Sequence, residues 1–493
     1  MESFAPAVLT QQKPFGDQPA AATLQQPLPH RFPEELPRSA AFRIRINNGI
    51  TSFMEESTIH EIQQLDVLEH IAAHHTSFEL SGPVDVEIEI LTPRDASESP
   101  TAAPFVRPLS RGIRGTMHGD NILRITLAGP ENLQIEIDGQ PLLYIYALPT
   151  APAAPTGPRV RRFEGGKIHN VGLLHLKEGE TCWIDAGAVV RGSIRSERTA
   201  HVRVGGYGIL DGSYWVETEN RRRKSLVLDH CRHARIETIL MLSPCHWMVV
   251  LGGCADIEIH GVRQIAFDIS SDGIDICGSR RIHITGCCLH NGDDNIAIKA
   301  IHNRSGQDDR VPVGFPDEDW KGNVEDVLVE NCTFYNIKGG SSMEIGYETS
   351  TDHIRNIRFR NIDVIAVHEF GSVFGIHNGD RACVENVEWD DIRVEHHYDK
   401  LIDIRVVKSR WNLDPGRGYV RNITLRNIRV VQSPFNSGYT LSVISGYDAQ
   451  HPVSNVLIDH FELGGRVVHS ADELDLVSRH LQGLKFSNGS IAA

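Results

Sequence analysis

Two acidic pairs lie one short block apart in the middle of the chain, and carboxylates at this spacing could do acid–base chemistry. Asp272 and Asp275 occur in Ser-Ser-Asp-Gly-Ile-Asp, and Asp293 and Asp294 occur in Asn-Gly-Asp-Asp-Asn-Ile-Ala-Ile-Lys, which ends at Lys299. The segment between them includes Arg-Ile-His-Ile-Thr, which alternates polar and apolar residues as a strand does. The pattern predicts carboxylates that project from neighbouring strands.

Three converging carboxylates have two chemical uses. They can bind Ca²⁺ through their oxygens, or they can hydrolyse a glycosidic bond. Hydrolysis needs one acid that stays protonated through like-charge crowding and a second that is ionised and activates water. The alternative is that Asp-Gly and Asp-Asp mark solvated turns. The 21 residues between Asp272 and Asp293 favour a shared site, because that interval is close to one minimal coil of a β-solenoid.

Composition excludes several classes of partner. A net charge of -15 argues against nucleic acid or an anionic membrane, since both need a basic protein face. No apolar run is long enough to span a bilayer. The N-terminus shows no signal peptide, which predicts a cytoplasmic location, or a secreted one if a signal was removed.

The cysteines and histidines predict no metal and no cofactor. The nine cysteines include no C-x-x-C pair and most lie beside strand-like runs, so buried reduced thiols are expected. The 25 histidines include no H-E-x-x-H motif.

Changes in composition and in the alternation of polar and apolar residues predict four segments. Residues 1–40 are rich in Pro, Ala and Gln and read as an extended arm. Residues 41–150 alternate strictly between turns, which predicts a small antiparallel β-sandwich. A Pro-rich linker follows at residues 151–160, and residues 161–493 form the segment that carries the acidic pairs.

One short unit recurs in this last segment. It consists of a polar residue, most often Asn or Asp, followed by an aliphatic residue, any residue and another apolar residue. Copies begin at Asp256, Arg281, Asp326, Asn356, Asn386, Asn422 and Asn455. Short strands at a repeating interval with little helical patterning predict a parallel β-solenoid. An α/β barrel would need long helices between its strands, and a propeller would need about four strands per repeat.

The acidic block resembles the signatures of the polygalacturonase family, glycoside hydrolase family 28. Asp272-Gly-Ile-Asp is similar to N-T-D-G-x-D, and Gly292-Asp-Asp-Asn-Ile-Ala-Ile-Lys is similar to G-D-D-C-I-A-I-K. Stretches that start at Gly206, Ser243 and Gly339 match further family motifs in the same order. The resemblance implies a right-handed parallel β-helix that hydrolyses a polysaccharide or oligosaccharide by single, inverting displacement.

The resemblance also implies roles for individual residues. Asp293 would be the general acid, while Asp272 and Asp294 would hold and deprotonate the attacking water. Lys299 would line the sugar site; its alternative interpretation is a solvated lysine at a strand end.

The chain departs from the family pattern where the family grips a galacturonate carboxylate. The family's R-I-K aligns with Gly375 and His377, and the histidine of a neighbouring motif is Ser341 here. Arginine is the natural bidentate partner of a carboxylate, so its loss predicts a neutral sugar or a relocated clamp.

Several nearby side chains are therefore candidates for binding substrate. Lys408 and Arg410, just before Trp411, could be the relocated clamp, with a solvated basic turn as the alternative. Glu344 and Glu348 could add acids or accept sugar hydroxyls, or could simply be exposed charges at a strand end.

Three alternative functions stay open from the sequence. A β-sandwich ahead of a β-helix also resembles the dextranase and isopullulanase family, which implies a neutral α-glucan substrate. A carbohydrate-binding solenoid without activity and a polysaccharide lyase are the other two. Three retained aspartates favour hydrolysis, because binding alone does not need mutually repelling acids.

Overall fold

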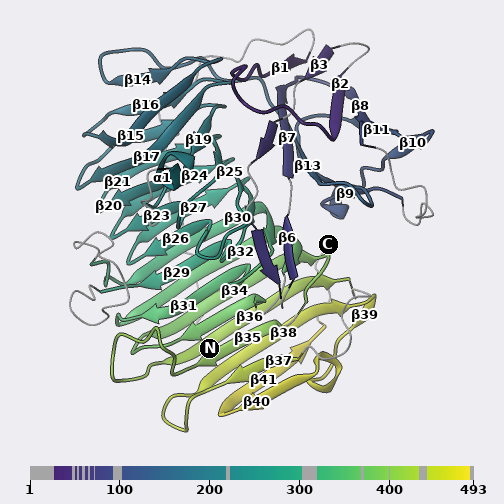
Figure 1. Cartoon of the computed structure of the whole chain (residues 1–493). Coiled ribbons are helices and arrows are strands. Elements are labelled where there is room, and N and C mark those ends of the chain that lie inside the picture. Colours follow the sequence, from purple (N-terminus) through teal and green to yellow (C-terminus); the bar gives the residue numbers. More distant parts are fainter. Residues whose placement is uncertain are drawn as a thin grey trace.

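The computed structural model consists almost wholly of β-strands. It describes residues 27–46, 73–92, 103–217, 223–302, 319–367, 371–398, 400–431 and 441–488, with the backbone of short strands between residues 50 and 70. A two-sheet unit lies beside the first coils of a long stack, which runs from β14 (Val160–Phe163) to β41 (Leu481–Ser487) (Figure 1). Among the described residues, no helix has the length and apolar character needed to cross a membrane.

The N-terminal unit is the predicted β-sandwich. One sheet has the order β1 (Leu28–Pro29), β7 (Ala73–Glu79), β13 (Leu142–Leu148), β12 (Glu131–Glu136) and β9 (Phe105–Arg107). The other has the order β10 (Thr116–His118), β11 (Ile122–Leu127), β8 (Val84–Ile90), β2 (Phe42–Ile46) and β3 (Ile50–Ser52). The pairings are antiparallel except that β7 and β13 run parallel. Strand β1 lies within the segment predicted as an arm.

The rest of the described chain is a parallel β-helix, as predicted. One row consists of short strands: β20 (Leu226–Asp229), β23 (Val249–Gly252), β26 (Ile274–Cys277), β29 (Ile296–Ala300), β31 (Met343–Thr349), β33 (Ser372–Asn378), β35 (Lys400–Val406), β37 (Ser442–Ser445) and β40 (Leu476–Arg479). We call it the short-strand row.

Two further rows complete each coil. In the first coils, one row consists of β14 (Val160–Phe163), β16 (Thr181–Ile184), β18 (Arg203–Gly205), β21 (Arg232–Glu237), β24 (Ala255–His260) and β27 (Arg280–Thr285). The other consists of β19 (Ile209–Asp211), β22 (Leu240–Leu242), β25 (Arg263–Ile265) and β28 (Cys288–Asn291). Strands β15 (Ile168–Leu176) and β17 (Val189–Glu197) begin in this second row and continue into the short-strand row. Later coils carry both rows on one long bent strand: β30 (Val324–Asn336), β32 (His353–Val367), β34 (Cys383–Val394), β36 (Tyr419–Val430) and β38 (Val453–Leu463), followed by β41 (Leu481–Ser487). The described residues contain one short α-helix, α1 (Ser213–Glu217), and two 3-10 turns at Leu109–Arg111 and Asp472–Leu474.

The first residue of each predicted repeat has a positive φ. The values lie between 52° and 62° for Asp256, Arg281, Asp326, Asn356, Asn386, Asn422 and Asn455. Asn and Asp tolerate this left-handed conformation better than other residues that carry a side chain. The amides also form a ladder between coils: Asn386 Nδ2 donates to Asn356 Oδ1 at 3.2 Å, and Asn422 Nδ2 donates to Asn386 Oδ1 at 3.1 Å. Each copy of the repeat therefore marks the same bend in its coil, and these bends stack in register along the β-helix.

The aliphatic residue that follows each bend fills the interior of the coils. These aliphatic residues are register partners from coil to coil: Ile257, Ile282, Val327, Ile357, Val387, Ile423 and Val456. Each is at most 1% exposed. Burial of such a side chain contributes about 1.5–3 kcal/mol, so the stack holds the coils together along their length.

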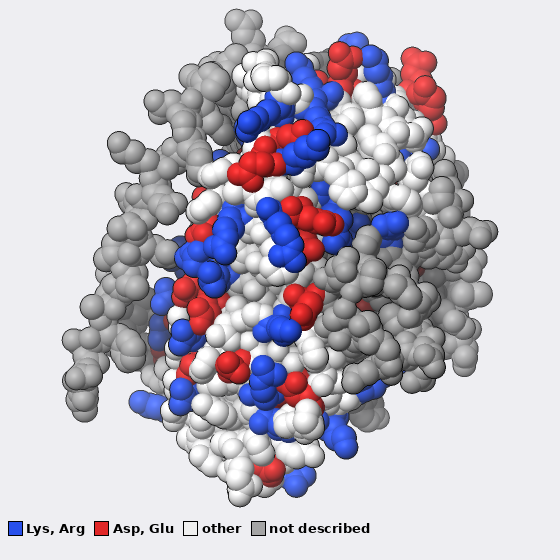
Figure 2. Space-filling model, turned by 90° about the vertical axis from the view of Figure 1, so that its left-hand side faces the viewer, with Lys and Arg blue, Asp and Glu red and all other residues white. Residues whose placement is uncertain are grey.

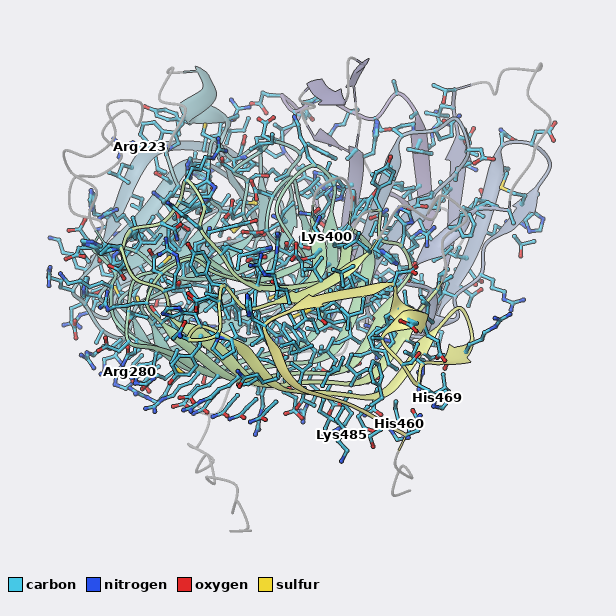
Figure 3. The ribbon with its side chains drawn as sticks, turned by 90° about the horizontal axis from the view of Figure 1, so that it is seen from below. Arg223, Arg280, Lys400, His460, His469 and Lys485 are labelled. Atoms are coloured by element: carbon cyan, nitrogen blue, oxygen red, sulfur yellow. The ribbon has the colours of Figure 1, made fainter. Side chains whose placement is uncertain are left out.

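Outward residues of the long strands form ion pairs between coils. Arg355 Nη2 lies 2.8 Å from Glu325 Oε1, and Arg360 Nη2 lies 2.5 Å from Glu330 Oε2. Acidic and basic side chains are interspersed on the face shown in Figure 2. In the view from below, Arg280 and Lys485 lie on the side opposite Arg223 (Figure 3).

The sandwich packs against the β-helix through a mixed apolar and polar contact. Tyr144 of β13 hydrogen-bonds His290 of β28, and both belong to a layer of aromatic rings. Arg107 Nη1 of β9 lies 2.5 Å from Glu395 Oε2, which follows β34. These contacts fix the sandwich beside the coils that carry the acidic block.

We predict that Asn386→Ala lowers the free energy of unfolding by about 1–3 kcal/mol, because alanine is strained at positive φ and cannot continue the amide ladder. Asn386→Gly also loses the ladder but relieves the strain, so it should cost less. Urea unfolding of both variants measures the difference. Equal losses would show that the left-handed bend carries no cost.

Candidate active site

The acidic block, Asp272 to Lys299, lies where the chain enters strands β26 and β29 of the short-strand row. Strands β26 and β29 pair in parallel with Ile274 opposite Ile296. Asp272 and Asp294 each lie two residues before this pair, and the Gly273 N–H donates to the Asp294 carbonyl oxygen at 2.7 Å. The coil is thus one residue longer than the interval between Asp272 and Asp293, so Asp294 is the residue stacked on Asp272.

The structure brings the three predicted catalytic carboxyl groups together. One oxygen from each of Asp272, Asp293 and Asp294 lies within 4.8 Å of the other two. Backbone N–H groups fix two of them: Ser270 donates to Asp293 Oδ2 at 2.8 Å, and Ser341 donates to Asp294 Oδ1 at 2.6 Å. Ser341, at the position of the family's histidine, therefore holds Asp294 through its backbone.

Glycines shape the loop that carries the two consecutive aspartates. A Cβ on Gly340, which has φ +67°, would lie 2.3 Å from Asp293 Oδ1 and 2.6 Å from Asp294 Oδ1. A Cβ on Gly292 would lie 2.3 Å from the Asp268 carbonyl oxygen. Both distances are shorter than van der Waals contact, so only glycine lets the carboxyl groups approach as they do.

Lys299 is buried among the carboxyl groups. Its Nζ lies 2.8 Å from Asp272 Oδ2, 2.9 Å from Asp275 Oδ1 and 4.0 Å from Asp294 Oδ2. Burial lowers the pKa of Lys299, but the surrounding carboxylates outweigh burial and hold it well above its ordinary value. The ring of Trp247 lies 4.2 Å from the same Nζ. Lys299 is thus a permanent positive charge at the centre of the cluster.

Burial and crowding raise the pKa values of the neighbouring acids. Burial, helped by the charge of Asp272, raises the pKa of Asp293 to about 7. Burial and both neighbouring aspartates raise the pKa of Asp294 well above its ordinary value. Burial does the same to the pKa of Asp275, although Lys299 opposes it. The cluster therefore retains protons near neutral pH, as a general acid requires.

A second buried network lies on the next strands of the same row. His377 Nδ1 lies 2.7 Å from Glu344 Oε1, and His377 Nε2 lies 3.1 Å from Asp403 Oδ2. Arg405 closes the network with its Nε 2.5 Å from Asp403 Oδ1. Burial lowers the pKa of His377, but Glu344 and Asp403 outweigh it and raise that pKa to about 9. Two cations are thus paired with two carboxylates.

The carboxylate of Glu344 occupies the space that a side chain at position 375 would need. A Cβ on Gly375 would lie 2.2 Å from Glu344 Oε2. An arginine could not occupy this position without moving Glu344. Where the family has the two cations of its clamp, this chain therefore has Gly375 and His377, and the carboxylate of Glu344 fills the space beside Gly375 and pairs with His377.

Lys408, Arg410 and Trp411 are not brought to the carboxyl cluster. They are exposed and lie in the turn after β35, whereas the carboxyl groups are level with the beginning of these strands. The Arg410 guanidinium instead covers the Trp411 ring at 4.5 Å. The placement matches the alternative interpretation, a solvated basic turn. Glu348 is half-buried on β31, and its charge raises the pKa of Lys299.

Three residues of the site were not among the predicted ones: Asp275, Asp403 and Arg405. Asp275 stands in the same motif as Asp272, but the sequence pattern assigned it no role. Asp403 and Arg405 belong to the alternating strand β35, where Asp403 pairs with Gly375 and Arg405 pairs with His377. Charged residues at alternate positions of a predicted strand could have indicated that Asp403 and Arg405 share one face of the strand.

Comparison with known proteins identifies the family. The model of glycosyl hydrolases family 28 matches residues 181–440, which is more than half of the chain. The chain belongs to this family. The matched region contains every aspartate of the carboxyl cluster together with Lys299 and the His377 network.

Curated relatives of this family 28 member match over shorter stretches. A probable polygalacturonase from Arabidopsis thaliana is 27% identical over 31% of this chain and 35% of its own length. A probable exopolygalacturonase C from Aspergillus terreus is 28% identical over 31% of this chain and 30% of its own. The match thus spans about a third of the length of these relatives.

Among solved structures, Dex49A from Penicillium minioluteum is similar over nearly the whole chain. The similarity covers 93% of this chain and 96% of that one, with a TM-score of 0.64 and 14% sequence identity. At this identity the likeness concerns the fold, and it includes the sandwich as well as the β-helix.

We predict that Gly340→Ala lowers turnover at least about tenfold, because the new methyl group displaces Asp293 and Asp294 from each other. Gly465→Ala is the matched control, since Gly465 also has a positive φ but has open space where the Cβ would be. Steady-state kinetics and thermal unfolding of both variants separate the two effects. Similar turnover in the two variants would contradict a role for Gly340 in placing the acids.

Proposed function

We propose that the protein is an inverting glycosidase in which Asp293 is the general acid and Asp272 and Asp294 activate water. The observation that carries this proposal is the convergence of three carboxyl groups within 4.8 Å around the loop of Gly292 and Gly340. Membership of glycosyl hydrolases family 28 supports it.

The charges suggest how the roles divide. Asp293, with a pKa of about 7, carries a proton that it can give to the glycosidic oxygen. Asp272 is ion-paired with Lys299 at 2.8 Å, which stabilises a carboxylate that can accept a proton from water. Asp294, held by the Ser341 N–H, would orient the same water from the next coil.

The spacing of the carboxyl groups makes the stereochemical outcome worth measuring. Inverting pairs are typically about 6.5–9.5 Å apart and retaining pairs about 5–5.5 Å. One oxygen of each carboxyl group here lies within 4.8 Å of the other two, which is shorter than the gap typical of inverting pairs. Spacing alone would favour retention, whereas the likeness of the acidic block to its family favours inversion.

The charges of the His377 network favour a neutral sugar as the preferred substrate. The cations nearest to position 375, His377 and Arg405, are already paired with Glu344 and Asp403. A uronate carboxylate would have to displace one of these carboxylates, whereas a sugar hydroxyl would not. Hydrolysis of polygalacturonate is the second candidate, favoured by the names of the curated relatives.

We predict that Asp293→Asn lowers kcat by about 10²–10⁴ while leaving substrate binding nearly intact, because it removes the proton donor and keeps the shape. Asp326→Asn is the control, since other coils carry Asn at that bend. Kinetics on whichever glycan a reducing-sugar screen identifies give both constants. Near-normal turnover in Asp293→Asn would reject Asp293 as the acid.

The wild-type enzyme should release the inverted anomer. Proton NMR at early times, before mutarotation, shows which anomer forms first. Release of the retained anomer would assign one aspartate as a nucleophile and reject direct attack by water.

We predict that the enzyme cleaves polygalacturonate at least about tenfold more slowly than a neutral glycan such as dextran. Glu344→Gln leaves His377 and Arg405 with one carboxylate fewer, so it should raise relative activity on polygalacturonate by about tenfold. Lys408→Ala, in the exposed turn, should not change this ratio. Faster cleavage of polygalacturonate than of dextran by the wild type would contradict the proposed specificity.

A further inference from the structure

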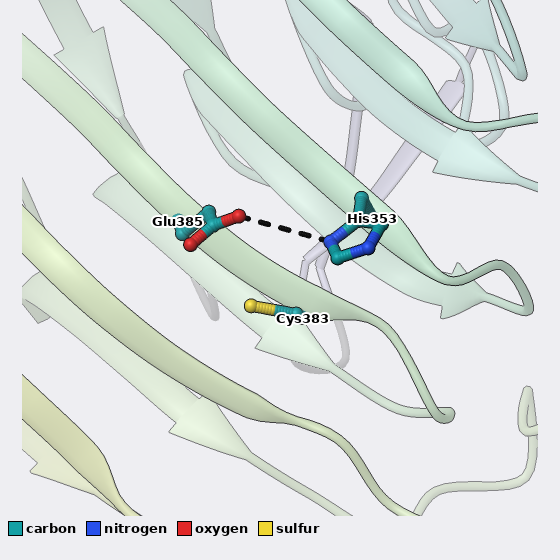
Figure 4. Close-up of side chains that lie close together, drawn as sticks. All are labelled: His353, Cys383 and Glu385. Atoms are coloured by element: carbon teal, nitrogen blue, oxygen red, sulfur yellow. Dashed lines mark ion pairs between the residues drawn. The ribbon is translucent and has the colours of Figure 1, made fainter.

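Three metal-ligating side chains meet on the long strands, on a different row from the carboxyl cluster. His353 begins β32 and is the register partner of Cys383, which begins β34. Glu385 follows Cys383 by two residues on the same strand face, and Figure 4 shows the three side chains close together. His353 lies 30 residues from Cys383 along the chain, so no local spacing revealed the group.

The distances suit a single small ion. One donor atom from each of the three side chains lies within 4.8 Å of the other two. His353 Nδ1 lies 3.7 Å from Glu385 Oε1, which is too long for a hydrogen bond. Within the part of the chain that the structure describes, this buried nitrogen has no hydrogen-bond partner. Donors around tetrahedral Zn²⁺ lie roughly 3.3–3.8 Å apart, so small side-chain rotations would complete the geometry.

Groups around the cluster hold two of the donors in place. Arg421 contacts Glu385 with its Nε at 2.7 Å and its Nη2 at 2.6 Å, and both contacts are to Oε2. Oε1 is thereby left facing His353. The hydroxyl of Tyr419 hydrogen-bonds the Cys383 thiol. Outer contacts of this kind orient metal-binding side chains.

We propose that His353, Cys383 and Glu385 bind one Zn²⁺, with water as the fourth ligand. A nitrogen, a sulfur and a carboxylate oxygen form a ligand set that Zn²⁺ accepts, whereas Ca²⁺ takes six to eight oxygens. The His353 side chain is 40% exposed, which gives an ion access from solvent. Bound Zn²⁺ would tie β32 to β34 and stabilise the later coils.

The test uses the full chain stripped with a chelator and titrated with ZnCl₂ in a calorimeter and with CoCl₂ in a spectrophotometer. We expect one thiolate-to-cobalt charge-transfer band and one Zn²⁺ per chain at this site. Cys383→Ser should abolish the band and weaken Zn²⁺ binding at least about tenfold. His353→Gln, at a partly exposed position, should weaken binding similarly.

Two controls assign the ion to this cluster. His233→Gln removes another histidine near a carboxylate, since His233 Nδ1 lies 3.9 Å from Asp256 Oδ2, and it should change nothing. Asp293→Asn alters the carboxyl cluster and should leave the cobalt band unchanged, so this result is separate from the proposed glycosidase activity. Absence of the band at saturating Co²⁺, or unchanged Zn²⁺ affinity in Cys383→Ser, would overturn the proposal.

Discussion

One buried ammonium group shared by three carboxyl groups is the interaction on which the candidate active site depends. Lys299 Nζ lies within 4.0 Å of oxygens from Asp272, Asp275 and Asp294. Without this charge the acids would have to take up protons or move toward water, since mutual repulsion and burial both oppose their ionisation. With it, the cluster can hold one ionised carboxylate and one protonated acid side by side.

The parallel register of the coils creates this cluster and the second network. Successive coils place residues far apart in sequence at one level, such as Asp272 beside Asp294 and Gly375 beside Asp403. The bends at positive φ keep the level constant along the stack. Chemistry can therefore change by substitution within one row while the fold stays the same.

The sequence predicted the β-helix well because its bends recur as Asn or Asp before an aliphatic residue. It also located the catalytic candidates, since Asp272, Asp293 and Asp294 lie on adjacent coils within one short segment. It named Glu344 and His377 of the second network but not their partners Asp403 and Arg405. Arg405 reaches His377 only through the pairing of β33 with β35, which no local pattern encodes. Lys408 and Arg410 carry the charge that a relocated clamp would need, but they lie in the exposed turn after β35.

The pH dependence of kcat/KM tests the central claim most directly, because that claim requires Asp293 to keep a proton near neutrality in the free enzyme. A general acid with a pKa of about 7 is lost as the pH rises through that value, so activity should be present below pH 7 and fall above it. The residual activity of Asp293→Asn should lack this basic limb. A basic limb that persists in Asp293→Asn, or wild-type activity that stays constant well above pH 7, would contradict the account.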